Sequence, residues 1–223
     1  DHSNKNKTYN SHYLGVKNLY DVFKKKKIER FVQIGSSSEY GKILGAVKES
    51  NICKPKMIYG RSKLMATNFL FKKNKLKKFP FTILRFFQVY GPFQKTNRLI
   101  PFVISSSLQN KRFDCSEGSQ LRDFLYIDDA IDSIIKSFKM EKSKGRIINI
   151  GYGTPIEVKK IVLMINELIQ KGKPKFGKLN LRVDESKNIY PDLRIAKKIL
   201  GWKNKTSLKE GLIKTIQFYK QNL

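Results

Sequence analysis

The spacing of hydrophobic residues over the first ninety positions predicts alternating helices and strands. Apolar side chains recur at helical spacing between Thr8 and Lys27 and predict a helix there. The β-rich run Arg30–Gly35 predicts a strand, which is followed by a helix over Ser62–Lys73 and a second strand over Phe79–Phe87. This order predicts an α/β fold with a parallel sheet that is covered by helices on both faces.

The rest of the chain predicts shorter elements without an internal repeat, a low-complexity linker or a clean domain break. Strands are predicted at Arg112–Asp114, Phe124–Tyr126, Arg146–Ile150 and Leu181–Val183. Helices are predicted at Leu99–Gln109, Asp128–Met140, Pro155–Lys171, Leu193–Leu200 and Leu208–Gln221. Thr154-Pro155 is interpreted as the start of its helix, because proline is favoured in a first helical turn. This half is expected to combine late strands of the sheet with a smaller lobe.

The formal net charge of +28 raises the question of nucleic-acid binding. Only nine of the 46 basic residues are Arg, and Lys is spread along the whole chain. The densest runs, Lys24–Lys27 and Lys72–Lys78, fall where helices are expected to end, and cations there complement the helix dipole. We therefore predict no nucleic-acid partner, but a positive field that attracts anionic substrates.

Cysteine, histidine and hydropathy argue against several other classes of protein. The two Cys, Cys53 and Cys115, are far apart, and both His lie near the N-terminus, so neither a disulfide framework nor a metal site is predicted. No apolar run reaches the length of about 18 residues that a membrane span needs. These features predict a cytoplasmic protein with reduced thiols and no membrane partner.

The candidate chemistry lies in two neighbouring segments. Tyr59 and Lys63 are four residues apart at the start of a predicted helix, so their side chains share a face. A nearby ammonium favours a phenolate, which can take a proton from a hydroxyl group. About twenty residues earlier the first strand ends in Ser36-Ser37-Ser38, and ligands bind at the carboxyl ends of strands in open α/β sheets.

Several further motifs agree in order and spacing with one family. The matching segments are Gly15–Leu19, Phe31–Gly41, Tyr59–Lys63, Leu84–Pro92, Gly118–Asp129, Asn149–Gly151 and Leu200–Trp202. In combination they resemble the extended short-chain dehydrogenase/reductases, the NAD-dependent epimerase/dehydratase family acting on nucleotide sugars. The resemblance covers essentially all 223 residues.

The resemblance implies an architecture for the chain. It implies a single, N-terminally truncated unit, with a Rossmann-like parallel sheet that lacks its first βαβ units. The Rossmann-like part would comprise about residues 1–98 and 123–151. A small α/β substrate-binding lobe would comprise about residues 99–122 and 152–223. A homodimer through the helices at Thr8–Lys27 and Ser62–Lys73 is implied as well.

The resemblance also implies catalytic and cofactor-binding roles. Ser36 would hold the substrate hydroxyl, Tyr59 would be the acid/base, and Lys63 would bind the cofactor ribose and tune Tyr59. These three, with Phe86 and Val89, are expected to contact NAD or NADP.

Substrate-binding roles follow from the same resemblance. The expected contacts with a nucleotide-diphosphate sugar are Ser37, Ser38, Gln88, Arg122, Arg182 and Glu185. The family usually has Asn at the place of Gln88, so an altered reach is expected there. Arg suits diphosphate, because its planar fork binds phosphate oxygens in pairs. Asp128 and Asp129 are expected to cap the helix that follows.

The chain also departs from the family pattern. No Gly-x-x-Gly-x-x-Gly turn for the cofactor pyrophosphate occurs in it, so the chain is expected to be a fragment, inactive by itself and with apolar surface uncovered. Dehydratase members place an acid where this chain has Ser38, with Glu39 one position too late.

The predicted function is therefore that of a nucleotide-sugar epimerase or 4-keto-reductase. Gly172–Gly177 resembles members in surface-polysaccharide sugar pathways, which suggests the same setting. A 4,6-dehydratase and a non-catalytic nucleotide-binding remnant remain as alternatives.

Overall fold

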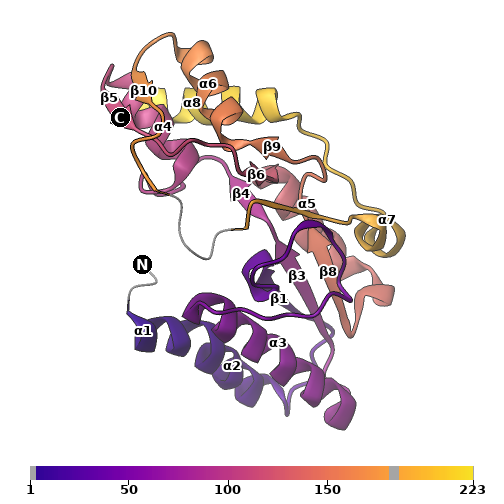
Figure 1. Ribbon diagram of the computed structural model, residues 1–223. Helices are drawn as coiled ribbons and strands as arrows, with labels where there is room; N and C mark the ends of the chain where they lie inside the picture. The colour runs from indigo at the N-terminus through magenta and orange to yellow at the C-terminus, as the bar shows by residue number, and fades with distance from the viewer. Residues whose placement is uncertain (1–3, 181–185, 223) are drawn as a thin grey trace.

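The computed structural model describes residues 4–180 and 186–222 (Figure 1). Its helices are α1 (Lys5–Tyr9), η1 (Asn10–Leu14), α2 (Gly15–Phe23), η2 (Ser37–Glu39), α3 (Ile58–Lys77), α4 (Leu99–Leu108), α5 (Ile127–Lys139), η3 (Glu141–Ser143), α6 (Val158–Ile169), α7 (Arg194–Leu200) and α8 (Leu208–Asn222). Its strands are β1 (Phe31–Ser36), β2 (Gly45–Val47), β3 (Phe81–Phe86), β4 (Gln88–Tyr90), β5 (Arg112–Asp114), β6 (Leu121–Arg122), β7 (Phe124–Tyr126), β8 (Arg146–Ile150), β9 (Ile156–Glu157), β10 (Lys173–Lys175) and β11 (Asn188–Pro191). The predicted α/β class is confirmed.

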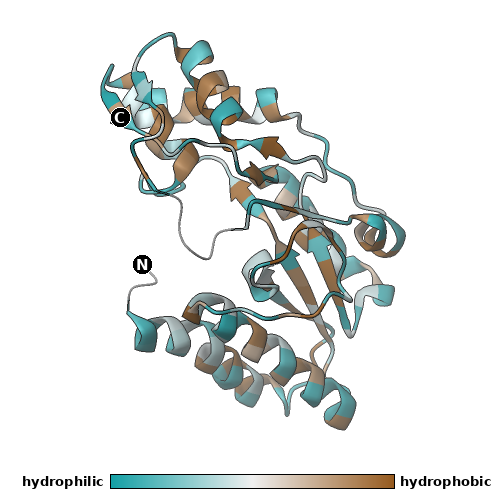
Figure 2. Cartoon of the chain, viewed as in Figure 1, coloured by the Kyte–Doolittle hydropathy of each residue, from teal (hydrophilic) through white to brown (hydrophobic). Residues whose placement is uncertain are grey.

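A parallel sheet of order β1-β3-β8 lies at the centre of the lower half in Figure 1. Successive side chains of a strand point to opposite faces, and both faces of β3 are buried. Phe81 and Ile83 pack with α2 and α3, whereas Leu84 and Phe86 pack with α5 and α7. Figure 2 shows hydrophobic residues along β3 and β8 and hydrophilic residues over much of α1. The sheet is therefore covered on two sides, as the sequence predicts.

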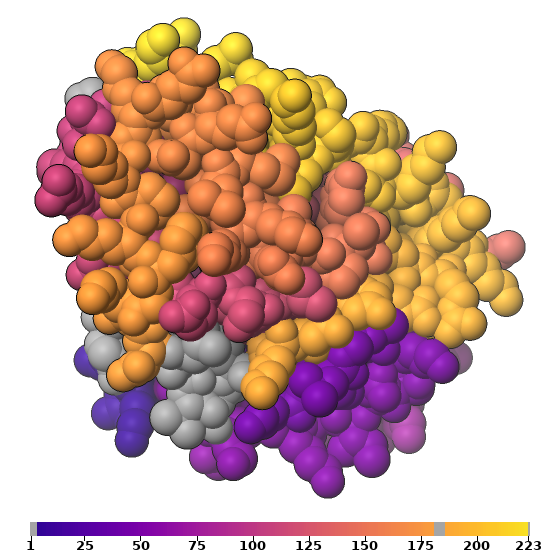
Figure 3. All heavy atoms as spheres, turned by 45° about the horizontal axis from the view of Figure 1, so that its top comes forward, coloured from indigo at the N-terminus to yellow at the C-terminus, as the bar shows by residue number. Residues whose placement is uncertain are grey.

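The upper half of the molecule is a second packed unit (Figure 1). Helices α4, α6 and α8 contact one another, and their buried side chains form one apolar cluster with β4, β5 and β7. A four-stranded sheet of order β2-β11-β6-β9 joins the two halves. Figure 3 shows the β11 segment lying along the segment around β2, with which it pairs in parallel.

One predicted helix start was wrong. Ile156 and Glu157 form β9, antiparallel to β6, and α6 begins at Val158 rather than at Pro155. Pairing with β6 holds these two residues extended, which overrides the helix-start signal of Thr154-Pro155. The strand predicted at 181–183 lies outside the described residues.

The predicted helix cap at Asp128 and Asp129 was also wrong. Helix α5 has no side-chain cap, although both residues lie in its first turn. The Asp129 carboxylate instead accepts hydrogen bonds from Lys205 N and Thr206 N, both at 3.0 Å. Asp129 therefore fastens the segment after α7 to α5.

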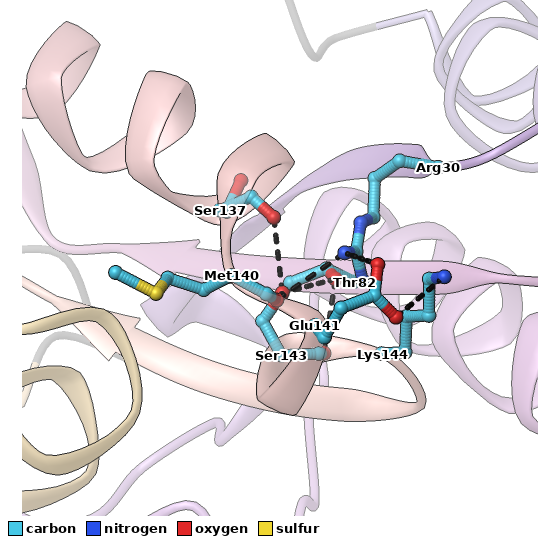
Figure 4. A network of polar contacts seen from close by, with 7 residues as sticks. All are labelled: Arg30, Thr82, Ser137, Met140, Glu141, Ser143 and Lys144. Carbon is cyan, nitrogen blue, oxygen red and sulfur yellow. Dashed lines mark hydrogen bonds and ion pairs between the residues drawn. The ribbon is translucent and has the colours of Figure 1, made fainter.

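A network of polar contacts closes the amino end of the sheet (Figure 4). Thr82 Oγ1 donates to Ser143 O at 2.9 Å, and Ser143 Oγ donates to Ser137 O at 3.0 Å. Arg30 Nη2 donates to Met140 O at 3.2 Å. These contacts tie the end of α5 to β1 and β3, at the opposite end of the strands from Ser36.

The edge of the central sheet that β1 forms lies near exposed apolar residues. Among the described strands, β1 pairs with β3 alone. Ile34 of β1 is 40% exposed, and Ile131, Ile135 and Phe138 on one face of α5 are exposed as well. These residues form an uncovered apolar surface beside the free edge of β1.

Candidate active site

Ser36 lies at the carboxyl end of β1, and its hydroxyl is held in place locally. Its backbone is extended, and Ser36 Oγ accepts a hydrogen bond from Ser38 N at 3.1 Å. The Glu39 carboxylate accepts from Ser36 N at 3.0 Å, which completes a capping box over η2. Ser36 is 8% exposed, Ser37 is half-buried and Ser38 is exposed.

Tyr59 and Lys63 both come from the first two turns of α3. Ser36 acts on the pKa of Tyr59 through its side chain, so the structure brings the two predicted hydroxyls near one another. Lys63 Nζ lies 5.9 Å from the centre of the Tyr59 ring and donates to Ile34 O at 2.7 Å. The three residues that the sequence singles out therefore form one cluster at the end of β1.

The pKa of Tyr59 depends most on burial. Burial raises the pKa of Tyr59, while Ser36 and the charge of Arg98 act to lower it. Burial also lowers the pKa of Lys63, against the charge of Glu39. Desolvation of the phenol is the largest of these effects, and the tuning of Tyr59 by Lys63 stays a prediction.

His12 also packs against Tyr59, a contact that the sequence does not indicate. The rings of His12 and Tyr59 meet edge to face, with their centroids 5.0 Å apart. His12 belongs to η1, a stretch of π-helix between α1 and α2. No signal near His12 in the sequence indicates this contact, which depends on how the first helix packs against α3.

A cavity of about 380 Å³ lies beyond the cluster, between β4, α4 and β6. Its size is typical of small-molecule sites. The cavity is lined by Gln88, Val89 and Arg122 from the predicted set, and by Arg98, which the sequence analysis missed. Arg98 also acts on the pKa of Tyr59, so it connects the cavity with the cluster. Two arginines in the lining of one cavity suit an anionic ligand.

The remaining predicted site residues are placed as follows. Arg122 is 6% exposed, and its Nη1 donates to Leu121 O at 2.7 Å. Phe86 is 8% exposed and packs in the apolar cluster with α5 and α7, so its contact with a cofactor stays a prediction. Arg182 and Glu185 lie outside the described residues.

The described residues contain neither a metal-binding cluster nor a membrane-spanning helix. Between residues 4 and 180 and from 186 to 222, no group of three or more His, Cys, Asp or Glu is arranged to hold a metal ion. Within the same ranges, no helix combines the length and the apolar character of a membrane span.

A family model described as the NAD dependent epimerase/dehydratase family matches residues 1–151 of the chain. The chain belongs to this family. An uncharacterised UDP-glucose epimerase of Bacillus subtilis (strain 168) is 30% identical over 204 residues, which are 91% of this chain and 64% of that protein. The human dTDP-D-glucose 4,6-dehydratase is 32% identical over 88% of this chain and 58% of its own length. The chain thus spans less than two thirds of these relatives.

Solved structures of the family have the same fold. The UDP-glucuronic acid 4-epimerase from Bacillus cereus, in complex with UDP-glucuronic acid and NAD, superposes with a TM-score of 0.89 at 30% identity. The match covers 95% of this chain and 68% of that one. Pal from Bacillus thuringiensis superposes with a TM-score of 0.90 at 27% identity, over 99% of this chain and 71% of that one. The predicted Rossmann-like family fold is confirmed.

Proposed function

We propose that the protein carrying this chain is an NAD(P)-dependent nucleotide-sugar epimerase or 4-keto-reductase, acting in the synthesis of surface-polysaccharide sugars. The observation that carries this proposal is the cluster of Ser36, Tyr59 and Lys63 at the end of β1, together with a cavity whose lining includes two arginines. A hydroxyl pair of this kind can hold a sugar oxygen and exchange its proton, while the arginines bind the diphosphate.

The residues present fit one end of the cofactor. Tyr59 and Lys63 supply a hydroxyl and an ammonium side by side, which suit the ribose next to a nicotinamide ring. The chain has no Gly-rich pyrophosphate turn, so its own residues account for the nicotinamide end only. When bound, the cofactor would supply hydride-transfer chemistry at the sugar carbon.

The chain's own residues would handle the proton and the orientation of the sugar. Tyr59 takes the proton from the hydroxyl of the reacting carbon, and Ser36 holds the same oxygen. Lys63, with its Nζ 5.9 Å from the centre of the Tyr59 ring, would stabilise the negative charge that the Tyr59 oxygen carries before it takes the proton. Gln88, at the start of β4, lies two residues beyond Phe86, whose partner in the sheet register is Ser36. We propose that it contacts the sugar.

The state of Glu39 argues against the dehydratase alternative. Water elimination needs an acid that protonates the departing hydroxyl. The Glu39 side chain is fully buried and is held by Ser36 N, Thr67 and Arg85, so it is not directed at a ligand. Ser38, at the place of the usual acid, cannot act as one.

The test uses the full-length protein that carries this chain. We expect it to purify with bound NAD(H) or to bind added NAD(P), and to convert at least one UDP-, dTDP- or GDP-sugar. An epimerase recycles its cofactor, whereas a reductase consumes NADPH in proportion to product. Absence of turnover with all three nucleotide classes, in a folded protein that binds the cofactor, would favour the remnant.

A further inference from the structure

A buried ion pair lies directly beneath the Ser36–Tyr59 contact. The Glu39 side chain is 0% exposed and that of Arg85 is 2% exposed, with Arg85 Nη2 2.9 Å from Glu39 Oε2. Arg85 Nε donates to the same oxygen at 2.9 Å. Two such buried charges are expensive to desolvate, so their retention points to a specific geometric role for the pair.

Glu39 connects three elements that carry or border the cluster. Its Oε1 accepts from Ser36 N at the end of β1, and its Oε2 accepts from Thr67 Oγ1 of α3 at 2.8 Å. Arg85, which holds the same oxygen, belongs to β3. A single carboxylate thus fixes the end of β1, the middle of α3 and the end of β3 relative to one another.

The position of Thr67 makes this connection relevant to Tyr59. Tyr59, Lys63 and Thr67 follow one another at intervals of four residues, so they form one stripe along α3. The hydrogen bond of Thr67 fixes the rotation of α3 about its axis, and its position along that axis, relative to β1. The close approach of the helix is permitted by Gly60, where a Cβ atom would lie 2.3 Å from Ser38 O.

We propose that Glu39, Arg85 and Thr67 are positioning residues, which set the distance between the hydroxyls of Ser36 and Tyr59 by fixing α3 against the end of β1. This inference rests on the proposed function, since the distance matters for turnover only if the two hydroxyls act on substrate. None of the three side chains contacts the substrate. Their effect is exerted through the backbone of Ser36 and the stripe on α3.

The test replaces Thr67 in the full-length protein, because Thr67→Val removes one hydrogen bond and keeps the side-chain shape. Turnover is measured with the nucleotide sugar that the unaltered protein converts and with saturating NAD(P). We expect Thr67→Val to lower kcat about tenfold, since a displacement of about 1 Å can lower the rate about a hundredfold. KM should stay within about twofold. Thr67→Ser, which restores the hydroxyl, should recover kcat.

Thr82→Val is the matched control. Thr82 is a buried threonine that donates to Ser143 O at the far end of the sheet (Figure 4). Its replacement should reduce stability and leave kcat and KM unchanged. An unchanged kcat in Thr67→Val, a loss no larger than in Thr82→Val, or a failure of Thr67→Ser to recover kcat would overturn the proposal.

A second measurement separates this inference from the proposed function. The ionisation of Tyr59 is followed by NMR of ring-labelled tyrosine, with its signal assigned by its loss in Tyr59→Phe. Burial raises the pKa of Tyr59 and Ser36 lowers it, so a displaced α3 in Thr67→Val should shift the titration midpoint, and Thr67→Ser should not. If no nucleotide sugar is converted, the proposed function fails. If the Tyr59 titration midpoint is the same in Thr67→Val and in the unaltered protein, the positioning role is overturned.

Discussion

Asp123 makes the stability of this chain dependent on pH in an unusual direction. The residue is fully buried between β6 and β7, and its carboxylate accepts hydrogen bonds from Tyr152 N at 2.6 Å and Gly153 N at 2.5 Å. Burial nevertheless raises the pKa of Asp123 from 3.8 to about 7, because the two amide donors offset only part of the desolvation. Asp123 follows Arg122 directly, so it supports the wall of the cavity.

The sign and the size of this pH dependence follow from the difference in protons bound by the folded and the unfolded chain. Between about pH 4 and pH 7 the unfolded chain has released the Asp123 proton and the folded chain still holds it. The unfolded state therefore binds fewer protons, and the free energy of unfolding falls as pH rises through this window. A difference of about three pKa units corresponds to ~4 kcal/mol. Above pH 7 this contribution is constant.

The assay compares the unaltered chain with Asp123→Asn in urea unfolding from pH 4 to pH 8. Unfolding is followed by the fluorescence of Trp202, the single tryptophan, which is 1% exposed. Because Asn does not titrate, the difference between the two curves isolates Asp123 from the other ionisable groups. We expect the advantage of the unaltered chain to shrink by a few kcal/mol across the window. A difference that is constant with pH, or that grows, would refute the reasoning.

Two further predictions concern α3 and the charge beside Tyr59. Gly60→Ala should lower stability by about 1–3 kcal/mol and reduce turnover, because its Cβ would meet Ser38 O at 2.3 Å. The control is Gly15→Ala, whose Cβ has its nearest contact at 3.6 Å. This control should be neutral or stabilising in thermal unfolding. Equal effects of the two substitutions would contradict the close approach of α3. Arg98→Gln should shift the pH profile of kcat/KM to higher pH, because the charge of Arg98 lowers the pKa of Tyr59. A shift to lower pH would show that Arg98 does not act on the base.

The elements that the sequence predicts best are those that local pattern determines. The strands at 112–114, 124–126 and 146–150 occur at the predicted residues, since each is a short run of β-forming residues. The sequence analysis missed β2, β6, β9 and β11, which have two to four residues each and exist because they pair with one another across the chain. Long-range pairing leaves little local signal, and it also displaced the start of α6.

The residues of the candidate site also fall into those that local sequence pattern indicates and those that only the packing of the folded chain brings near. Ser36, Tyr59 and Lys63 were accessible to sequence reasoning because helical spacing and a strand end determine their proximity. His12 and Arg98 were not, because each lies near the cluster through packing between elements that are distant in the sequence. The contribution of burial to the pKa of Tyr59 was missed for a related reason, since burial is a property of the folded chain.

Turnover of Tyr59→Phe in the full-length protein tests the central claim most directly. The substitution removes one hydroxyl and keeps the ring that packs against His12. With NAD(P) and a converted nucleotide sugar, we predict a fall in kcat of at least about a hundredfold, with cofactor binding retained. Turnover equal to that of the unaltered protein would contradict the assignment of Tyr59 as the acid/base.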